Sequence, residues 1–213
     1  MDRDAVVARY RGLRKIVATY NKVVLARLTR RAIFDHARFL GLLAGKTIVT
    51  ETEEELGLIF DLAIHSPRHA RSRAFERYRH SVKLPADPDE ARVLDALCRA
   101  RFAICRIERR HAVAGLVAFD LMREAEIWLM DLSMEATVSD GFVFAAHLIE
   151  LDGFSMTTGL LVPVDRDDVE DALDDMPARR VGAPEELADD PLFAGLVWRA
   201  ALARGAMENV TFA

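Results

Sequence analysis

The chain has 213 residues, of which 51% are hydrophobic and 30% charged, and its formal net charge is −5 at pH 7. This composition is typical of a globular protein and excludes the disordered, fibrous and disulfide-rich classes. No segment approaches the roughly 18 consecutive apolar residues of a transmembrane helix, and we expect no secretory signal at the N-terminus. The two cysteines, Cys98 and Cys105, are expected to be reduced thiols in a cytoplasmic protein.

Charge is distributed unevenly along the chain. Residues 1–48 contain 11 Lys and Arg against three acids, whereas residues 165–213 contain 12 acids against five bases. Such asymmetry is typical of a polyanion-binding arm, or of two parts of a chain that attract each other. Internal attraction together with solvated charged faces is the default interpretation.

Apolar residues at intervals of three and four predict an amphipathic helix at the N-terminus. They are Val6, Tyr10, Leu13, Val17, Tyr20, Val24 and Leu28. A second apolar series continues as far as Gly45, a residue type that often follows the end of a helix. One long helix or two shorter ones both fit this pattern.

Capping patterns predict three further helices before residue 101. The capping box that begins at Thr52 predicts a helix that ends near His65. The apolar spacing of residues 75–82 indicates a second helix. Asp87-Pro88 combines an N-cap residue with a proline at the first helical position, which indicates the start of a third.

After residue 102 the pattern changes to short segments rich in β-branched and aromatic residues, separated by turn sequences at 139–141 and 151–153. The predicted strands are 102–107, 116–119, 127–130, 142–149 and 154–162. Five short strands predict a small antiparallel barrel of the SH3-like or OB-like type. A flat meander packed on the helices is the alternative.

Beyond Pro163 the chain is acidic, and we expect a short helix at 167–173 and a longer one that begins at Asp190-Pro191 and ends at Gly205. The fold class is therefore predicted to be α+β. Its three parts are a helical region over 1–101, a small five-stranded antiparallel barrel-like module over 102–164, and an acidic, helical C-terminal region over 165–213.

Four segments resemble known chemical motifs, but each lacks an essential member. Residues 41–47 are one residue short of a phosphate-binding P-loop, and a proline separates His65 from His69, which otherwise have a metal-ligand spacing. Residues 153–157 lack the closing glycine of a nucleophile elbow. Residues 165–176 lack the glycine and glutamate of a calcium loop. We therefore predict no metal and no cofactor.

An enzyme of unrecognised class, with a pocket between the helices and the β-module, is the alternative function. Its candidate groups are His65, His69, His111, Glu108 and Asp120. Cys98 or Cys105 with His111 is a further candidate pair of nucleophile and base. No convergent catalytic set has the spacing that such chemistry requires, so an enzyme is the less favoured reading.

Two basic groups are candidate partner-binding residues. Arg109, Arg110 and His111 follow the first predicted strand, where they would form a basic rim. The other group lies mostly off the apolar stripe of the N-terminal helix and consists of Arg11, Arg14, Lys15 and Lys22. We therefore predict a non-enzymatic binding or regulatory module for a protein or nucleic-acid partner. A protein partner or self-association is favoured over nucleic acid because the whole chain is acidic.

Five segments of the chain resemble a family of uncharacterised bacterial proteins. They are RFLGL at 38–42, DLAIH at 61–65, RIERRH at 106–111, DLSMEA at 131–136 and MTTG at 156–159. The resemblance covers residues 30–165 and implies a bacterial cytosolic protein, without an activity, cofactor or catalytic residue. The barrel-like part, with Gly115, Trp128 and Asp140-Gly141, is also similar to small barrels appended to other bacterial proteins.

Overall fold

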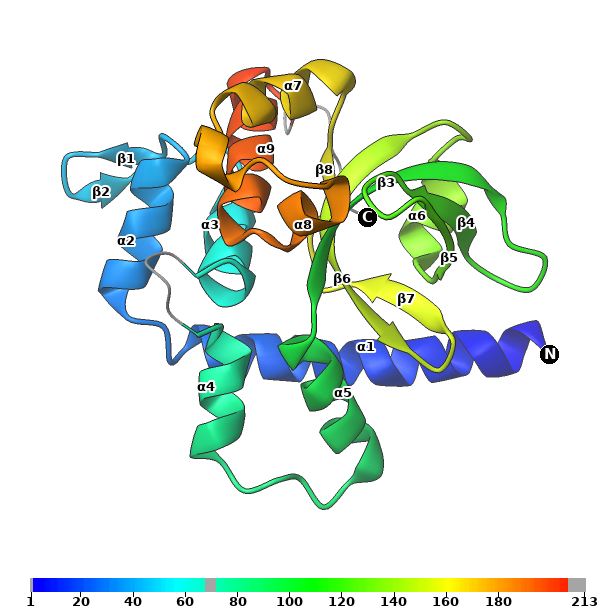
Figure 1. The fold of residues 1–213 in the computed structure, drawn as a ribbon. Helices are drawn as coiled ribbons and strands as arrows, with labels where there is room; N and C mark the ends of the chain where they lie inside the picture. The colour runs from blue at the N-terminus through cyan, green and yellow to red at the C-terminus, as the bar shows by residue number, and fades with distance from the viewer. Residues whose placement is uncertain (1, 68–71, 207–213) are drawn as a thin grey trace.

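The computed structural model describes residues 2–67 and 72–206. The fold is α+β, with a long N-terminal helix, a closed five-strand barrel and C-terminal helices (Figure 1). The helices are α1 (Arg3–Leu25), α2 (Arg30–Phe39), α3 (Glu53–His65), α4 (Ala74–Ser81), α5 (Pro88–Cys98), α6 (Leu132–Thr137), α7 (Arg166–Asp174), α8 (Pro184–Asp189) and α9 (Pro191–Ala203), with a 3₁₀ turn η1 at Ala178–Arg180. The strands are β1 (Leu43–Ala44), β2 (Thr47–Ile48), β3 (Arg101–Arg110), β4 (Leu116–Asp120), β5 (Ala125–Leu129), β6 (Val143–Leu151), β7 (Phe154–Thr157) and β8 (Val162–Pro163).

The two N-terminal apolar series form two separate helices. Asp2 begins α1 by accepting a hydrogen bond from the backbone N–H of Ala5 at 3.3 Å. Thr29 begins α2 in the same way, by accepting from the N–H of Ala32 at 3.2 Å. Because each helix has its own cap, the chain turns between them.

Gly45 does not end a helix, contrary to the prediction. Helix α2 ends at Phe39, and Gly41, with φ +80°, follows its last turn. Gly45, with φ +61°, lies instead in the turn of the β1–β2 hairpin. A helix end and a tight hairpin both require a residue with positive φ, so a glycine alone does not distinguish them.

The other predicted helix starts are confirmed. The hydroxyl of Thr52 accepts from the N–H of Glu55 at 3.2 Å, and a carboxylate oxygen of Asp87 accepts from the N–H groups of Asp89 and Glu90. Asp190 accepts from the N–H of Leu192 at 2.8 Å and begins α9. The sequence pattern missed α6, α8 and the β1–β2 hairpin, which are all short.

The barrel is mixed and not antiparallel as predicted. Its strands follow the order β3-β4-β5-β7-β6, and β6 pairs with β3 to close the ring. A closed ring of five strands cannot alternate direction throughout, so one neighbouring pair has to be parallel. That pair is β5 with β7, which meet at Leu129 and Ser155.

The last predicted strand is divided into two. Strand β7 ends at Thr157, and the chain resumes pairing with β6 only at β8, which begins at Val162. Gly159, with φ +147°, lies in the interruption. As a result β8 is at the end of the strand order and has one neighbour only, β6.

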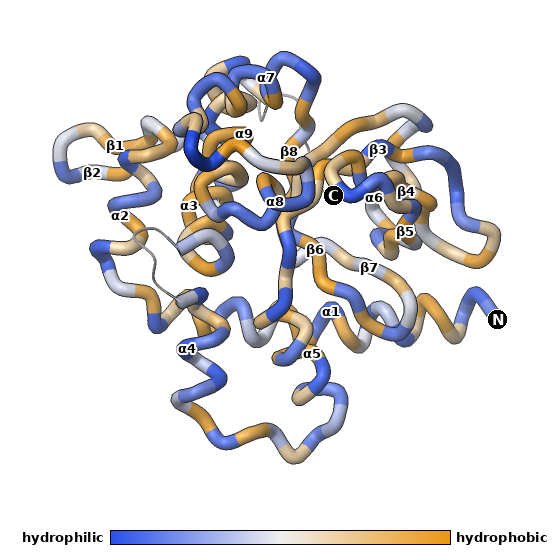
Figure 2. Tube along the Cα trace, in the orientation of Figure 1, coloured by the Kyte–Doolittle hydropathy of each residue, from blue (hydrophilic) through white to orange (hydrophobic). Residues whose placement is uncertain are grey.

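Helices cover the barrel on two sides, and the core has three parts (Figures 1 and 2). The barrel interior contains Phe144 and Leu148, among others. A second cluster joins α2, α3 and α7–α9 to the barrel and includes Phe102 and Trp198. A third joins α1, α4 and α5 to the barrel. The part of β3 from Phe102 to Cys105 and most of β6 are thus buried on both faces, which explains their apolar sequences.

A network of four charged side chains connects α1 to α5 and to the β6–β7 turn. Arg9 pairs with Asp89 and, at 2.6 Å, with Asp152, while Arg92 also pairs with Asp152. Among the described residues, no ion pair joins α1 or α2 to the acidic C-terminal region. Of the same residues, no helix combines the length and apolarity needed to cross a membrane.

Gly115 offers a test of the barrel packing. Its φ is +75°, and an added Cβ would overlap the carbonyl oxygen of Leu129 and the side chain of Met130. Gly153 has a similar φ of +82° but open space around the Cβ position, which makes it a matched control. We expect Gly153→Ala to cost about 1 kcal/mol through its backbone conformation alone. Gly115→Ala should cost roughly 1–3 kcal/mol more through overpacking.

Urea denaturation of both variants measures this difference in the free energy of unfolding. Equal losses for the two variants would contradict the close approach of Gly115 to β5.

Candidate functional site

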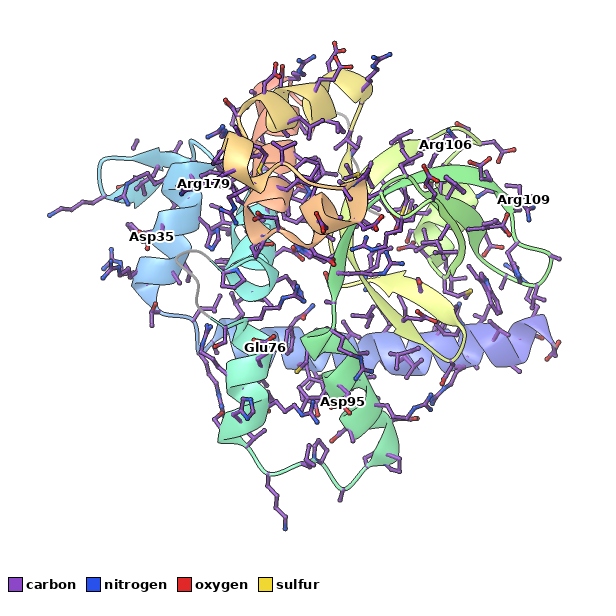
Figure 3. All side chains as sticks on the ribbon, in the orientation of Figure 1. Asp35, Glu76, Asp95, Arg106, Arg109 and Arg179 are labelled. Atoms are coloured by element: carbon purple, nitrogen blue, oxygen red, sulfur yellow. The ribbon has the colours of Figure 1, made fainter. Side chains whose placement is uncertain are left out.

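The three residues of the predicted basic rim at the end of β3 each contact a different part of the fold. Arg109 pairs with Glu126 on the outer face of the barrel, at 3.0 Å, and each side chain is 57% exposed (Figure 3). Arg110 donates to the carbonyl oxygens of Met134 and Val138. His111 stacks on Trp128 with ring centroids 4.1 Å apart. The role of the three residues in partner binding stays a prediction, and each already has a contact within the chain.

The basic residues of α1 lie together on its outer side. Arg11, Lys15 and Lys22 are exposed and follow helical intervals of four and seven residues. Arg14 is half-buried beside them and donates to the carbonyl oxygen of Thr157 at 2.5 Å. In the part of the chain that the structure describes, none of the four forms an ion pair.

The lack of ion pairs distinguishes Arg11 and Arg14 from most other described arginines, whereas the other described lysines, Lys46 and Lys83, form no ion pair either. Most other described arginines contact a carboxylate, and they are distributed over both the helices and the barrel. They are Arg3, Arg9, Arg31, Arg38, Arg79, Arg92, Arg101, Arg106, Arg109, Arg123, Arg166, Arg180, Arg199 and Arg204. No Asp or Glu occurs from residue 5 to residue 34, so no carboxylate lies within a helical turn of these four residues. Arg9, in the same stretch, pairs with the distant carboxylates of Asp89 and Asp152.

A groove of about 1370 Å³ lies beside the barrel, beyond the end of β7. One side is α6, with Ser133, Ala136 and Thr137, and the other is the segment from Thr157 to Pro163. Arg14 lies at the α1 side of this groove, and Asp165 and Asp168 lie at the α7 side. The volume exceeds that of a typical small-molecule pocket, about 300–1000 Å³.

A buried polar network lies between α3 and the barrel. Nδ1 of His147 on β6 is 2.5 Å from a carboxylate oxygen of Asp61, and Nε2 of the same ring is 3.1 Å from the hydroxyl oxygen of Ser66. The hydroxyl of Thr158 donates to the other oxygen of Asp61 at 3.0 Å. All four side chains are buried. The network therefore ties the end of α3 to β6 and to the residue that follows β7.

Aromatic rings enclose this network. His65 stacks on His147 with centroids 4.9 Å apart, and Phe102 and Trp198 contact the edge of His147. Burial lowers the pKa of His65 to about 3, so this ring is neutral. Although burial opposes ionisation of Asp61, the two histidines and the hydrogen bonds from His147 and Thr158 hold the pKa of its carboxyl below the usual value.

The hydrogen bonds from Ser66 to His147 and from His147 to Asp61 have the same order as those of a catalytic nucleophile, base and orienting acid. Acyl transfer also requires that a substrate reach the hydroxyl and that donors stabilise an oxyanion. Ser66 is 3% exposed, its own N–H donates to the carbonyl oxygen of Leu62, and it lines neither the large groove nor the two smaller cavities near Asp95 and near Tyr78. The arrangement accordingly supports a structural role.

The predicted catalytic candidates that the structure describes do not come together. Asp120 is buried between Arg101 and Arg123, and Glu108 pairs with Arg106 on the surface. His65 belongs to the buried network, whereas His69 lies outside the described residues. No group of three His, Cys, Asp or Glu within the described chain is placed to hold a metal ion.

The two cysteines are poorly suited to act as nucleophiles. Burial raises the pKa of Cys105 to about 12 and also raises the pKa of the Cys98 thiol. Both are therefore protonated at neutral pH, and a thiol is a much weaker nucleophile than a thiolate.

Sequence reasoning considered Asp61 and His65 but missed His147, Ser66 and Thr158. One signal was present, because His147 interrupts the apolar run of β6. A polar side chain inside a strand buried on both faces needs a hydrogen-bond partner. The identity of that partner depends on how α3 packs against the barrel.

The network makes Asp61 a residue on which stability should depend. Asp61→Ala leaves two buried donors, on His147 and Thr158, without their acceptor, so we expect a loss of about 2–6 kcal/mol. Asp35→Ala, which removes an acceptor of Arg31 and Arg38 at the surface, should cost at most about 1 kcal/mol. Denaturant titration of both variants measures the difference, and similar losses would argue against the network.

Acid sensitivity follows from the neutral, buried His65. Its folded pKa, about 3, lies below the ordinary value of 6.5, so only the unfolded chain binds a proton between these values. Stability is therefore complete above pH 6.5 and falls as the pH decreases toward 3. Asp61 adds a further loss below its ordinary pKa of 3.8.

Urea titrations at pH 7.5, 6.0 and 5.0 test the contribution of His65. The wild type should lose up to about 1.4 kcal/mol per pH unit from this one proton well below pH 6.5. His65→Gln should reduce that slope, whereas His80→Gln, at an exposed position, should leave it unchanged. An unaltered slope in His65→Gln would contradict the assignment.

Comparison with known proteins yields one match. Residues 4–179 match the model of a family described as "Family of unknown function (DUF7986)", a span wider than the resemblance at 30–165. No curated protein and no solved structure matches the chain. Since the family model spans most of the sequence, the chain belongs to the family of unknown function DUF7986.

Proposed function

We propose that this protein is a non-enzymatic binding module that recognises an acidic surface of a partner protein through the outer face of α1. The observation that carries the proposal is the group of unpaired cations Arg11, Arg14, Lys15 and Lys22 on a molecule whose other arginines are mostly ion-paired. An unpaired cation keeps its full attraction for an approaching anion, and no internal ion pair has to be broken.

The dimensions of this basic face favour a protein partner over nucleic acid. At a rise of about 1.5 Å per residue, Arg11 and Lys22 are about 16 Å apart along the helix. The face is thus one helix wide, and the whole chain has a net charge of −5. A long polyanion would extend beyond the cations onto an acidic surface, whereas an acidic helix or loop would match their extent.

The barrel supports a binding role in a second way, and we assign it to the OB type. Its ring order of first, second, third, fifth and fourth strand, with a helix between the third and the fourth, is characteristic of OB barrels. Such barrels bind other molecules on their outer face and loops. Fold type alone does not determine a ligand, so the α1 cations carry the argument.

A bacterial and cytoplasmic setting is part of the proposal. The resemblance of five segments to bacterial proteins supports the origin. The free thiols of Cys98 and Cys105 support a reducing compartment.

Charge reversal on α1 tests the proposed function. The triple variant Arg11→Glu, Lys15→Glu, Lys22→Glu should bind fluorescent poly-L-glutamate at least about tenfold more weakly than the wild type, a loss of ~1.4 kcal/mol. The matched control Arg38→Glu, Arg166→Glu, Arg199→Glu changes the net charge equally at ion-paired sites and should retain most of the binding. Fluorescence anisotropy at low and high salt measures both.

A single-stranded oligonucleotide of thymidines serves as the competing probe. If the wild type binds this probe more tightly than poly-L-glutamate and the α1 variant does not bind it, the partner is a nucleic acid and not an acidic protein. Equal losses in the two triple variants would show that net charge and not the α1 face determines binding, and would overturn the proposal.

A further inference from the structure

We infer that the groove between α6 and β8 binds an extended peptide segment of a partner protein, which adds a strand to the free edge of β8. The inference goes beyond the α1 face, because it depends on the backbone of residues 159–163 and on the apolar lining of the groove, although the two surfaces share Arg14.

The barrel wall is open at this position. Strand β7 pairs with β5 at Leu129 and Ser155 and ends at Thr157, and β8 continues along β6 with no second neighbour among the described strands. On the other side of the opening the chain leaves β5 and enters α6. A helix offers no free backbone groups along its sides, so α6 cannot complete the ladder.

The backbone of Leu161 points into this opening. The register pairs Val162 with Ala145, and the N–H of Val164 donates to the carbonyl oxygen of Val143 at 3.2 Å. In an antiparallel ladder alternate residues direct their backbone groups to opposite edges. Val162 and Val164 therefore face β6, and Leu161 and Pro163 face away from it.

Among the described residues, no backbone group pairs with the N–H or the carbonyl oxygen of Leu161. Leu161 lines the groove, which is open to solvent, so an incoming strand can reach these two backbone groups. An added strand would give both of them a backbone hydrogen-bond partner in place of water. Strand addition at an exposed edge is a common mode of peptide recognition.

The lining and charges of the groove describe the peptide. Phe142, Val138 and Leu161 extend the apolar interior of the barrel into the groove, so alternate residues of the peptide should be apolar. Arg14 lies near Thr157, at one end, and has no carboxylate partner within the described chain. The other end carries both signs of charge, because Asp165 and Asp168 lie there together with Arg166 and Arg204. The segment should thus carry an acidic residue at the Arg14 end.

A display library of random heptapeptides provides the probe. We expect wild-type protein to enrich alternating apolar sequences with one acidic end. Ala136→Trp places a large ring on the exposed, groove-facing side of α6 and should weaken the selected peptides at least tenfold. Ala86→Trp, at an exposed position outside the groove, is the matched control and should bind like the wild type.

Hydrogen exchange distinguishes strand addition from simple contact. Binding of a selected peptide should slow exchange of the Leu161 amide. An unchanged Leu161 amide, or no enrichment by the wild type over Ala136→Trp, would overturn the inference.

Two further measurements separate the alternatives. The α1 triple variant should bind the selected peptides within twofold of the wild-type affinity. The failure of the peptide proposal can therefore be distinguished from the failure of the proposed function of α1. Light scattering after size exclusion reports the oligomeric state. A wild-type dimer that Ala136→Trp converts to a monomer would identify a second copy of the chain, and not a partner protein, as the occupant.

Discussion

The pairing of β3 with β6 is the constraint on which the rest of this structure depends. It closes five strands into a ring, and an odd ring requires one parallel pair, which is β5 with β7. It also places both strands between the barrel interior and the helices. Phe144 and Leu148 point inward, whereas Phe102 and Ala145 face the helical layer. The groove lies along the other edge of β6, where β7 ends at Thr157 and β8 follows without reaching β5.

The buried network is a consequence of this two-sided burial. His147 lies on the helix-facing side of β6, where a polar ring has no access to water. It is accommodated because α3 brings Asp61 and Ser66 to its two nitrogens and the chain after β7 brings Thr158 to Asp61. Hydrogen bonds are directional, so this network orients α3 on the barrel more strictly than apolar contacts alone would. Its resemblance to a catalytic triad reflects shared hydrogen-bond geometry.

The two proposed binding surfaces differ in their physical basis. The face of α1 acts through unpaired charge, so its interactions should weaken as salt rises. The groove acts through backbone hydrogen bonds and apolar burial, which respond less to salt. Arg14 is half-buried in the groove and also belongs to the basic group of α1. Occupation of one surface can therefore influence the other through a single guanidinium.

The sequence by itself determined the local structure: the amphipathic stripe of α1, the capped helix starts, the positions of most strands, and the absence of acids near the α1 cations. These features depend on residues a few positions apart, whose propensities act within one element. Only the tertiary structure decided the parallel β5–β7 pair, the open edge of β8, and the meeting of Asp61 with His147, 86 residues away. Such features arise from chain closure and from packing between distant elements, which leave no periodic signal in the sequence.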